Sequence, residues 1–339
     1  LTCLLFMSFI TMAFSTLKMA NAKALVLALI LCYLLLGVSE GELRMGFYSQ
    51  TCPKAESVVK SVVSEAALAN PRIPAVLLRL QFHDCFVEGC DGSILIENGE
   101  DAEKNAFPHQ GLEGFGEIDK AKAQLEAVCP GVVSCADIVA LAARDAVALS
   151  KGQFYEVPTG RRDGRVSVKS LADNMPDVDD SIQLLKSKFT EKGLSDKDLV
   201  LLSAAHTIGT TACFFLKKRL YNFNERSDGS DPAISPQILP ELKAKCPKDG
   251  NVNERLPLDM KTGTIFDDQI LRNIKDGLAV VSSDARLYEE NTTKQVIDSY
   301  LGSSSSFEQD FAVSMVKMGQ IGVKTGSKGE IRKNCRAFN

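Results

Sequence analysis

The sequence contains no tryptophan, only three histidines and no excess of positive charge. Its 339 residues include 39 lysines and arginines against 43 aspartates and glutamates, a formal net charge of −4. This balance argues against a surface for nucleic acid or for anionic membranes. The basic run 160–165 is short and contains Asp163, which favours internal ion pairing over phosphate binding. The chain is long enough to bury a large core in one or two domains.

Alternating strand patterns are also scarce, whereas apolar residues at helical spacing recur along the chain. Capping residues such as Ser134 and Ser195, together with closing glycines and prolines, mark where helices begin and end. We expect helices over 54–70, 72–84, 135–149, 181–192, 195–206, 236–245, 267–276, 291–300 and 307–318. Short strands are expected near 324–332 at most. The pattern predicts an all-α protein.

The N-terminal segment has the pattern of a secretory signal peptide. Lys23 precedes the apolar run 24–37, which is short for a membrane span. The small residues Ser39 and Gly41 favour cleavage after Gly41.

The sequence starts with Leu1, and Met19 is an alternative start. Residues 1–18 would then be an upstream translation artefact, although their own apolar run could make them part of a signal anchor. We assign 1–41 to a removed upstream segment and signal peptide, and 42–339 to the folded domain.

Ten cysteines become eight when Cys3 and Cys32 are removed with that segment. An even number behind a secretion signal predicts disulfides, whose pairing the residues alone leave open. A zinc site of His83, Cys85 and Cys90 is the competing interpretation. It is disfavoured because no Cys-x-x-Cys pair occurs and an oxidising compartment consumes thiolates.

The segment from Arg79 to Ser93 is the most informative part of the chain. It combines an arginine, a histidine, two cysteines and alternating oxygen ligands. If its first part is helical, Arg79 and His83 lie on one face, one turn apart. A base and a fixed cation aimed at the same point suit an acid–base reaction that develops negative charge. His206 lies in a second helical segment, so two histidines could face one another across a bound group.

Several motifs, in this order and spacing, are similar to those of the secretory (class III) plant haem peroxidases. They are Phe47-Tyr-x-x-Thr-Cys-Pro53, Arg79-Leu-x-Phe-His-Asp-Cys-Phe-Val-x-Gly-Cys-Asp91, Val133-Ser-Cys-Ala-Asp-Ile138, Gly160-Arg-Arg-Asp163, Leu202-Ser-Ala-Ala-His-Thr-Ile-Gly209, Arg219-Leu-Tyr-Asn-Phe223, Thr264-Ile-Phe-Asp267 and Gly329-Glu-Ile-Arg-x-Asn-Cys335. The resemblance covers essentially all of 43–339. It implies an all-α haem peroxidase fold, with haem b held between a distal and a proximal helical half, four disulfides and two calcium sites.

The resemblance also implies catalytic roles. His83 would take a proton from bound peroxide and return it to the departing oxygen, while Arg79 would stabilise the charge that develops as the O–O bond breaks. His206 would be the axial ligand of the haem iron. Asp284 would accept the other N–H of His206, which makes the imidazole more electron-donating and favours high-valent iron.

Two calcium sites and four disulfides are implied in the same way. The first site would use Asp84, Val87, Gly89, Asp91 and Ser93, and the second Thr207, Asp259, Thr262, Ile265 and Asp267. Oxygen ligands alone suit Ca²⁺, although the EF-hand template is not met, so without the resemblance these residues would count as caps and surface acids. The implied disulfides are Cys52–Cys129, Cys85–Cys90, Cys135–Cys335 and Cys213–Cys246.

Other positions either match the family or depart from it. Asp137 and Arg161 would form a buried structural ion pair, and the carbonyl of Pro176 would lie near the haem edge where small phenols dock. The departures are His109 for the Asn that commonly partners the distal histidine, Leu258 for a Phe beside the proximal imidazole, Ala212 for a polar residue near a haem propionate, and Tyr155 for the usual Trp. A neutral His109 could accept a hydrogen bond from the Nδ1–H of His83 through one ring nitrogen, or it could point to solvent.

We therefore predict a secreted, monomeric haem peroxidase. It would reduce hydrogen peroxide and oxidise small phenolic or aromatic donors by one-electron steps, without nucleic-acid partners or stable membrane association. The alternative is a weakly active extracellular haem- and calcium-binding wall protein, impaired by His109 and Leu258. The chain ends four residues after Cys335, without a tail for vacuolar sorting, so the cell wall or apoplast is expected. Asn291-Thr-Thr293 is an acceptor for N-glycosylation.

Overall fold

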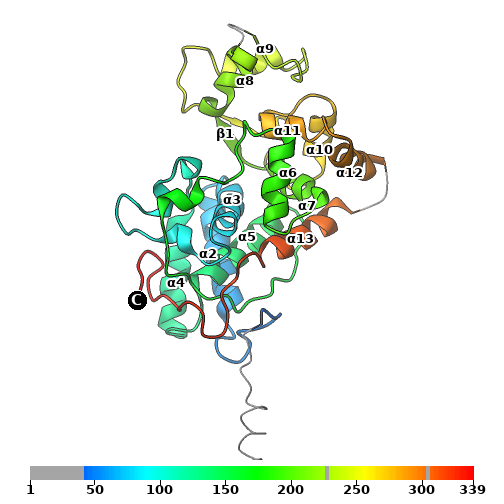
Figure 1. The fold of residues 1–339 in the computed structure, drawn as a ribbon. Coiled ribbons are helices and arrows are strands. Elements are labelled where there is room, and N and C mark those ends of the chain that lie inside the picture. Colours follow the sequence, from blue (N-terminus) through cyan, green and yellow to red (C-terminus); the bar gives the residue numbers. More distant parts are fainter. Residues whose placement is uncertain (1–41, 226–228, 303–305) are drawn as a thin grey trace, which may run out of the picture. The chain divides into compact units, whose positions relative to one another are not determined.

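The computed structural model describes residues 42–225, 229–302 and 306–339, and the predicted signal segment 1–41 lies outside them. These residues are mostly helical, as Figure 1 shows, and the predicted all-α class is confirmed. The α-helices are α2 (Ala55–Ala69), α3 (Ile73–Phe86), α4 (Phe115–Val128), α5 (Cys135–Leu149), α6 (Ile182–Glu191), α7 (Asp196–Ser203), α8 (Lys217–Tyr221), α9 (Leu239–Lys245), α10 (Gln269–Lys275), α11 (Ser282–Arg286), α12 (Asn291–Gly302) and α13 (Phe307–Met318). No helix in these ranges is long and apolar enough to cross a membrane.

Short 3-10 turns and one small sheet connect the helices. The turns are η1 (Ser93–Leu95), η2 (Glu103–Asn105), η3 (Phe107–His109), η4 (Lys169–Ala172), η5 (Ala204–Thr207), η6 (Cys213–Leu216) and η7 (Phe223–Glu225). Strand β1 (Thr210–Ala212) pairs antiparallel with β2 (Arg255–Pro257), so that Ala212 lies opposite Arg255. Near 324–332 the expected strands reduce to isolated bridges, from Lys324 to Arg162 and from Glu330 to Asp163.

The core is built around α5, which packs against α2, α3 and α4. Its alanines and branched aliphatic residues are buried on nearly all sides, which lets the neighbouring helices approach closely. Helices α12 and α13 pack against α7. A smaller cluster around Leu216, Leu220 and Leu242 fills the region of β1, β2, α8 and α9.

Two of the predicted helix starts are confirmed by their caps. Ser134 accepts a hydrogen bond from the Asp137 backbone N–H at 3.1 Å, and Ser195 forms a reciprocal capping box with Asp198. The helix expected over 195–206 is shorter than predicted. It ends at Ser203 and continues as the turn η5, because the chain then leaves to form β1.

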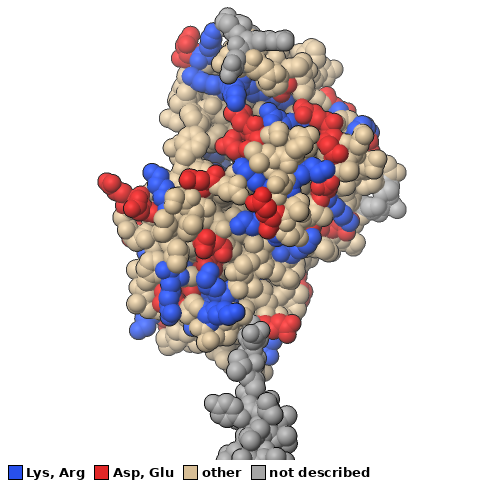
Figure 2. All heavy atoms as spheres, viewed as in Figure 1, with Lys and Arg blue, Asp and Glu red and all other residues tan. Residues whose placement is uncertain are grey.

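The disulfides and the buried ion pair of the fold are those that the resemblance implies. The disulfides are Cys52–Cys129, Cys85–Cys90, Cys135–Cys335 and Cys213–Cys246. The Cys85–Cys90 bond makes the alternative zinc site wrong, since it consumes both thiolates. Buried Arg161 donates from Nη1 to Asp137 Oδ1 at 2.7 Å, and Tyr48 donates to the other oxygen of Asp137 at 2.7 Å. On the face shown in Figure 2, acidic and basic side chains are interspersed.

Candidate active site

A cavity of about 470 Å³ is lined by both predicted functional histidines, His83 and His206. Arg79 and Pro176, which the sequence also predicts for the site, line it as well. Much of the remaining wall is apolar, including Phe82, Phe189, Leu202, Leu258, Met315 and Met318. Such a cavity, apolar with a few converging polar groups, is the usual form of a cofactor site.

Helix α3 presents Arg79 and His83 to this cavity from one face, one turn apart. Pro74 lies in the first turn of α3, where its missing N–H removes no helical hydrogen bond. Arg79 donates from Nη1 to the carbonyl of Gly111 at 3.2 Å. Burial, and then the nearby Arg255, lower the pKa of Arg79 to about 10, so it remains a cation at neutral pH.

His83 contacts His109, with 2.7 Å between their Nδ1 atoms. His109 lies in η3 and is 2 % exposed, so it does not point to solvent. Burial first, and then Arg79 and His109, hold the pKa of His83 well below its ordinary value. Burial and Arg79 lower the pKa of His109 to about 4. Both rings are therefore neutral near pH 7, and one Nδ1 donates to the other.

This pairing can keep Nε2 of His83 free as a base. If His83 carries its proton on Nδ1 and donates it to His109, its Nε2 lone pair faces the cavity. A ring in this tautomer, held by a fixed acceptor, is what a distal acid–base catalyst requires.

Glu103 is a buried neighbour of His109 that the sequence analysis did not identify. Its Oε1 lies 3.8 Å from Nε2 of His109, and the side chain is 0 % exposed. Neither carboxyl oxygen has a hydrogen-bond partner among the described residues. Burial first, and then the charges of Asp84 and Asp91, raise the pKa of Glu103 to about 9. Nothing in the local sequence signals this burial, because Glu103 begins the turn η2 within the mostly polar stretch 100–105.

His206 faces the cavity from η5 and is held by a carboxylate instead. Its Nδ1 lies 2.9 Å from Oδ1 and 3.0 Å from Oδ2 of Asp284, which is buried in α11. Burial alone would lower the pKa of His206, but the charge of Asp284 and the hydrogen bond to it outweigh burial and raise the pKa. The bond fixes the proton on Nδ1 and leaves Nε2 available to a metal. The His206 side chain is 38 % exposed, and it lines the cavity.

These features fit a haem. An apolar cavity of this kind accommodates a porphyrin, His206 offers a ring nitrogen with a carboxylate behind it, and Arg79 and His83 lie on the wall of the same cavity.

Ala212 and Leu258, two of the departures from the family pattern, also line the cavity. Tyr155, another of these departures, is not among the described lining residues and is buried elsewhere in the core.

The first group of expected calcium ligands lies in the loop between α3 and η1. Asp84 Oδ1 and Ser93 Oγ are buried without hydrogen-bond partners among the described residues. Burial and the charge of Asp91 raise the pKa of Asp84 to about 8. Asp91 forms an ion pair through its Oδ2 with Lys324. Two buried carboxylates with unpartnered oxygens beside them suit a hard cation.

The loop is tight because Gly89 lies against another segment. A Cβ at Gly89, where φ is +108°, would meet the backbone of Ile321 and Gly322 at 2.7 Å. The Gly89 carbonyl accepts from Asp91 N at 2.8 Å, and the Val87 carbonyl accepts from Lys192 Nζ at 2.8 Å. The Cys85–Cys90 disulfide closes the same loop.

The second group of expected calcium ligands is brought together behind His206. Thr207 donates to Asp267 Oδ1 at 3.0 Å and to the carbonyl of Ile265 at 3.4 Å. Thr262 lies 3.2 Å from Asp259 Oδ2 and 3.1 Å from Asp267 Oδ1. Each expected site contains two carboxylates. Within the described residues no three His, Cys, Asp or Glu side chains form a metal-ligand group, so the remaining ligands would be hydroxyl and carbonyl oxygens.

Comparison with known proteins agrees with this geometry. A family model described as peroxidase matches residues 59–303. Peroxidase 43 of Arabidopsis thaliana is 62% identical over 325 residues, covering 94% of this chain and 99% of that relative. The chain belongs to the peroxidase family. Peroxidase 13 of Arabidopsis thaliana is 58% identical, covering 93% of this chain and 99% of its own, and Peroxidase N1 of Nicotiana tabacum is 49% identical, covering 87% and 90%.

Membership of the family confirms the predicted class, that of the secretory plant haem peroxidases, and the predicted enzyme activity. The peroxidase uses a haem cofactor, hydrogen peroxide and a reducing substrate. The alternative, a binding protein with little turnover, is not favoured by relatives of this identity and coverage.

Proposed function

We propose that this peroxidase cleaves hydrogen peroxide in the cavity between His83 and His206 and oxidises small phenolic donors at its edge. The observation that carries the proposal is that both histidines line one apolar cavity, each with its Nδ1 held by a buried partner. Haem b, when bound, supplies the redox chemistry that passes the oxidising equivalents of peroxide to two donors in one-electron steps.

The distal residues handle protons and charge. His83 Nε2 accepts a proton from hydrogen peroxide and returns it to the oxygen that leaves as water. Arg79, one turn earlier on α3, stabilises the negative charge that develops between the two oxygens. His109 accepts a hydrogen bond from the Nδ1–H of His83 and so keeps Nε2 free.

The proximal residues hold the cofactor. His206 Nε2 would bind the haem iron, while Asp284 accepts the Nδ1–H and would increase the electron donation of the ring. The Pro176 carbonyl, at the cavity wall, is the acceptor for a donor hydroxyl.

Two calcium ions would hold the loops that follow the histidines. Asp84 directly follows His83, and Thr207 directly follows His206, so each ion orients one catalytic residue. The unpartnered buried oxygens of Asp84 and Ser93 support the first site. The convergence of Thr207, Asp259 and Asp267 supports the second site.

We further propose that 1–41 is removed as an upstream segment and signal peptide and that 42–339 acts as a secreted monomer in the apoplast or cell wall. The eight cysteines of 42–339 all form disulfides, which fits an oxidising compartment. Asn291, at the exposed start of α12, is available for glycosylation.

The test is a donor panel on residues 42–339 refolded with haem and Ca²⁺. We expect a Soret band, peroxide-dependent oxidation of small phenols, and no turnover without peroxide. A Soret band with no oxidation of any phenol would contradict the donor assignment. A monomer should be observed by light scattering.

A further inference from the structure

The wall of the cavity carries more positive than negative charge. Its described lining includes the three arginines Arg72, Arg79 and Arg255, and the two acids Glu113 and Asp177. Arg72 already pairs with Glu113, with 2.8 Å between Nη2 and Oε1, and Asp177 accepts a backbone N–H within its own turn. Among the described residues, Arg79 and Arg255 therefore have no carboxylate partner.

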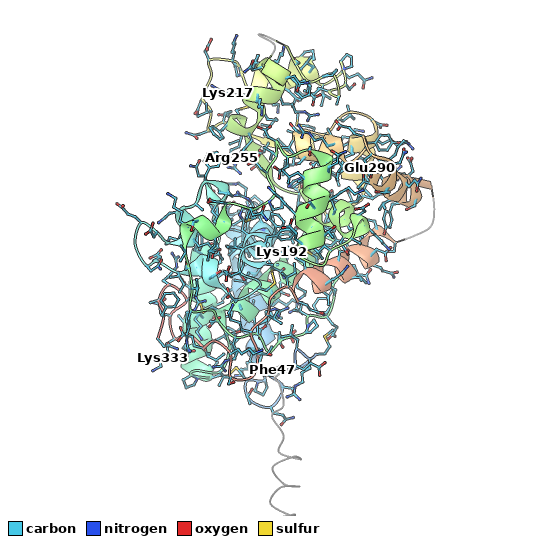
Figure 3. The ribbon with its side chains drawn as sticks, in the orientation of Figure 1. Phe47, Lys192, Lys217, Arg255, Glu290 and Lys333 are labelled. Carbon is cyan, nitrogen blue, oxygen red and sulfur yellow. A yellow bond between two sulfur atoms is a disulfide. The ribbon has the colours of Figure 1, made fainter. Side chains whose placement is uncertain are left out.

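Arg255 is fixed in place by the small sheet. Its Nε donates to Thr210 Oγ1 at 2.8 Å, and its Nη2 donates to the Thr210 carbonyl at 2.9 Å. Both bonds use one edge of the guanidinium, and Nη1 has no hydrogen-bond partner among the described residues. Figure 3 shows Arg255 between the segment that carries α8 and α9 and the helices around α3. Strand β1, to which Arg255 is bound, begins shortly after His206, and Arg255 and His206 line the same cavity.

The arginines of this wall repel one another. Burial and the charge of Arg255 lower the pKa of Arg79, and burial and the charge of Arg72 lower that of Arg255, although the charge of Glu113 offsets part of both effects. An anion bound among them would remove this repulsion. A guanidinium held by two hydrogen bonds is also preorganised for a carboxylate, because less side-chain freedom is lost on binding.

We propose that Arg255 anchors a propionate carboxylate of haem b at the wall of the cavity. The inference rests on the proposed binding of haem between His83 and His206. Haem b carries two propionates on one edge, and a guanidinium–carboxylate contact is a charge-assisted hydrogen bond. Ala212, which lines the cavity without a polar group, lies directly opposite Arg255 in the β1–β2 ladder. Arg255 thus supplies from the neighbouring strand a donor that Ala212 lacks.

The experiment measures the release of haem from reconstituted 42–339 to an excess of apomyoglobin. Arg255→Leu should release haem about tenfold faster, the scale of one charge-assisted hydrogen bond in a partly exposed site. The rate at which Arg255→Lys releases haem should lie between the rates of the parent and Arg255→Leu. Arg272→Leu is the matched control and should match the parent, because Arg272 lies in α10, pairs with Asp268 at 3.1 Å and does not line the cavity.

Haem b dimethyl ester lacks both free carboxylates. It therefore distinguishes loss of a contact between Arg255 and a propionate from a general loosening of the protein around the haem. Parent and Arg255→Leu should release the ester at the same rate. Unchanged release of haem, or an equal acceleration for haem and ester, would overturn the proposal.

A carboxylate of the reducing substrate is the other possible partner. If Arg255→Leu retains haem like the parent but raises KM for a carboxylated phenol and not for its uncharged analogue, the propionate assignment is wrong. A parent protein that takes up no haem would overturn the proposed function itself, and this inference with it.

Discussion

The two histidines of the cavity differ in the residue that holds each ring. His83 contacts a second histidine, His109, at 2.7 Å, whereas His206 contacts the carboxylate of Asp284 at 2.9 Å. Both contacts are made through Nδ1. Burial disfavours the charged form of both rings, but the pKa moves in opposite directions, well down for His83 and up for His206.

This difference shows how a partner assigns a role to a ring. Burial first, and then the charges of Arg79 and His109, keep His83 unprotonated and available as a base. A buried carboxylate instead polarises His206 towards imidazolate, which would strengthen it in its proposed role as a ligand. The following changes should break or sharpen this contrast, and they are ordered by expected effect.

The largest effect is expected from removing the proximal ring. His206→Ala should abolish stable haem retention, because no other histidine lines the cavity on that side among the described residues. Soret absorbance after gel filtration measures it, and His83→Ala is the matched control that should keep haem. Normal Soret absorbance together with normal turnover in His206→Ala would disprove the ligand assignment.

Removing the distal base should leave haem bound but slow the reaction with peroxide. His83→Ala should slow formation of the first oxidised species by at least ~10²-fold, the usual scale for a positioned acid–base group. Arg79→Leu should slow it less, since Arg79 stabilises charge but moves no proton. Stopped-flow rates within a factor of a few of the parent would exclude both roles.

Asp284→Asn tests the proximal partner without removing the ligand. The amide keeps a hydrogen-bond acceptor for the Nδ1–H of His206 but removes the charge that raises the pKa of that ring. Activity should fall roughly tenfold, at the lower end of the range for a residue that orients a metal ligand. The reduction potential of the bound iron should rise, because the ring donates fewer electrons. An unchanged potential would mean that Asp284 has only a packing role.

The sequence located the histidines far better than it located their surroundings. Arg79, His83 and His206 lie in the motifs that carry the family resemblance, and Asp284 was assigned from the resemblance itself; the structure brings these residues to one cavity or one contact. Local periodicity could not reveal Glu103, whose burial depends on contacts with residues distant in the chain.

The missed elements have simple physical causes. Helix α4 buries Lys122 on the same face as Ile118 and Leu125, which weakens its apolar stripe. Strands β1 and β2 are three residues long, too short for an alternating pattern to be detected. Their register, and with it the position of Arg255, follows from pairing between segments far apart in the sequence.

Removal of calcium should affect the surroundings of both His83 and His206. Chelation should lower the melting temperature by roughly 5 °C, the scale for losing tightly bound ligands from a domain of this size. It should also change the iron spin state, since Asp84 follows His83 and Thr207 follows His206. Asp84→Asn should remove only the contribution of the first calcium site to the melting temperature and spin state, and Asp259→Asn only that of the second. An unchanged melting curve and haem spectrum after verified metal removal would contradict both sites.

The smallest effect is expected from the distal partner, and only in acid. Burial and Arg79 lower the pKa of His109 from its ordinary value of 6.5 to about 4. Above pH 5 a neutral His109 can accept from His83, so His109→Asn should react with peroxide at a similar rate. As pH falls towards 4, protonated His109 has two donors and no acceptor, and the parent should lose activity faster than the variant.

The stability of the fold should also depend on the protonation of His109. Because the folded pKa of His109 lies below its ordinary value, the unfolded chain binds this proton first. The contribution of neutral His109 is therefore complete above pH 6.5 and is lost as pH falls from 6.5 to about 4. The melting temperature of the parent should fall more steeply over this interval than that of His109→Asn, whose amide does not titrate. Superimposed rate and melting profiles for the two proteins between pH 4 and 7 would show that His109 is not the partner that holds His83.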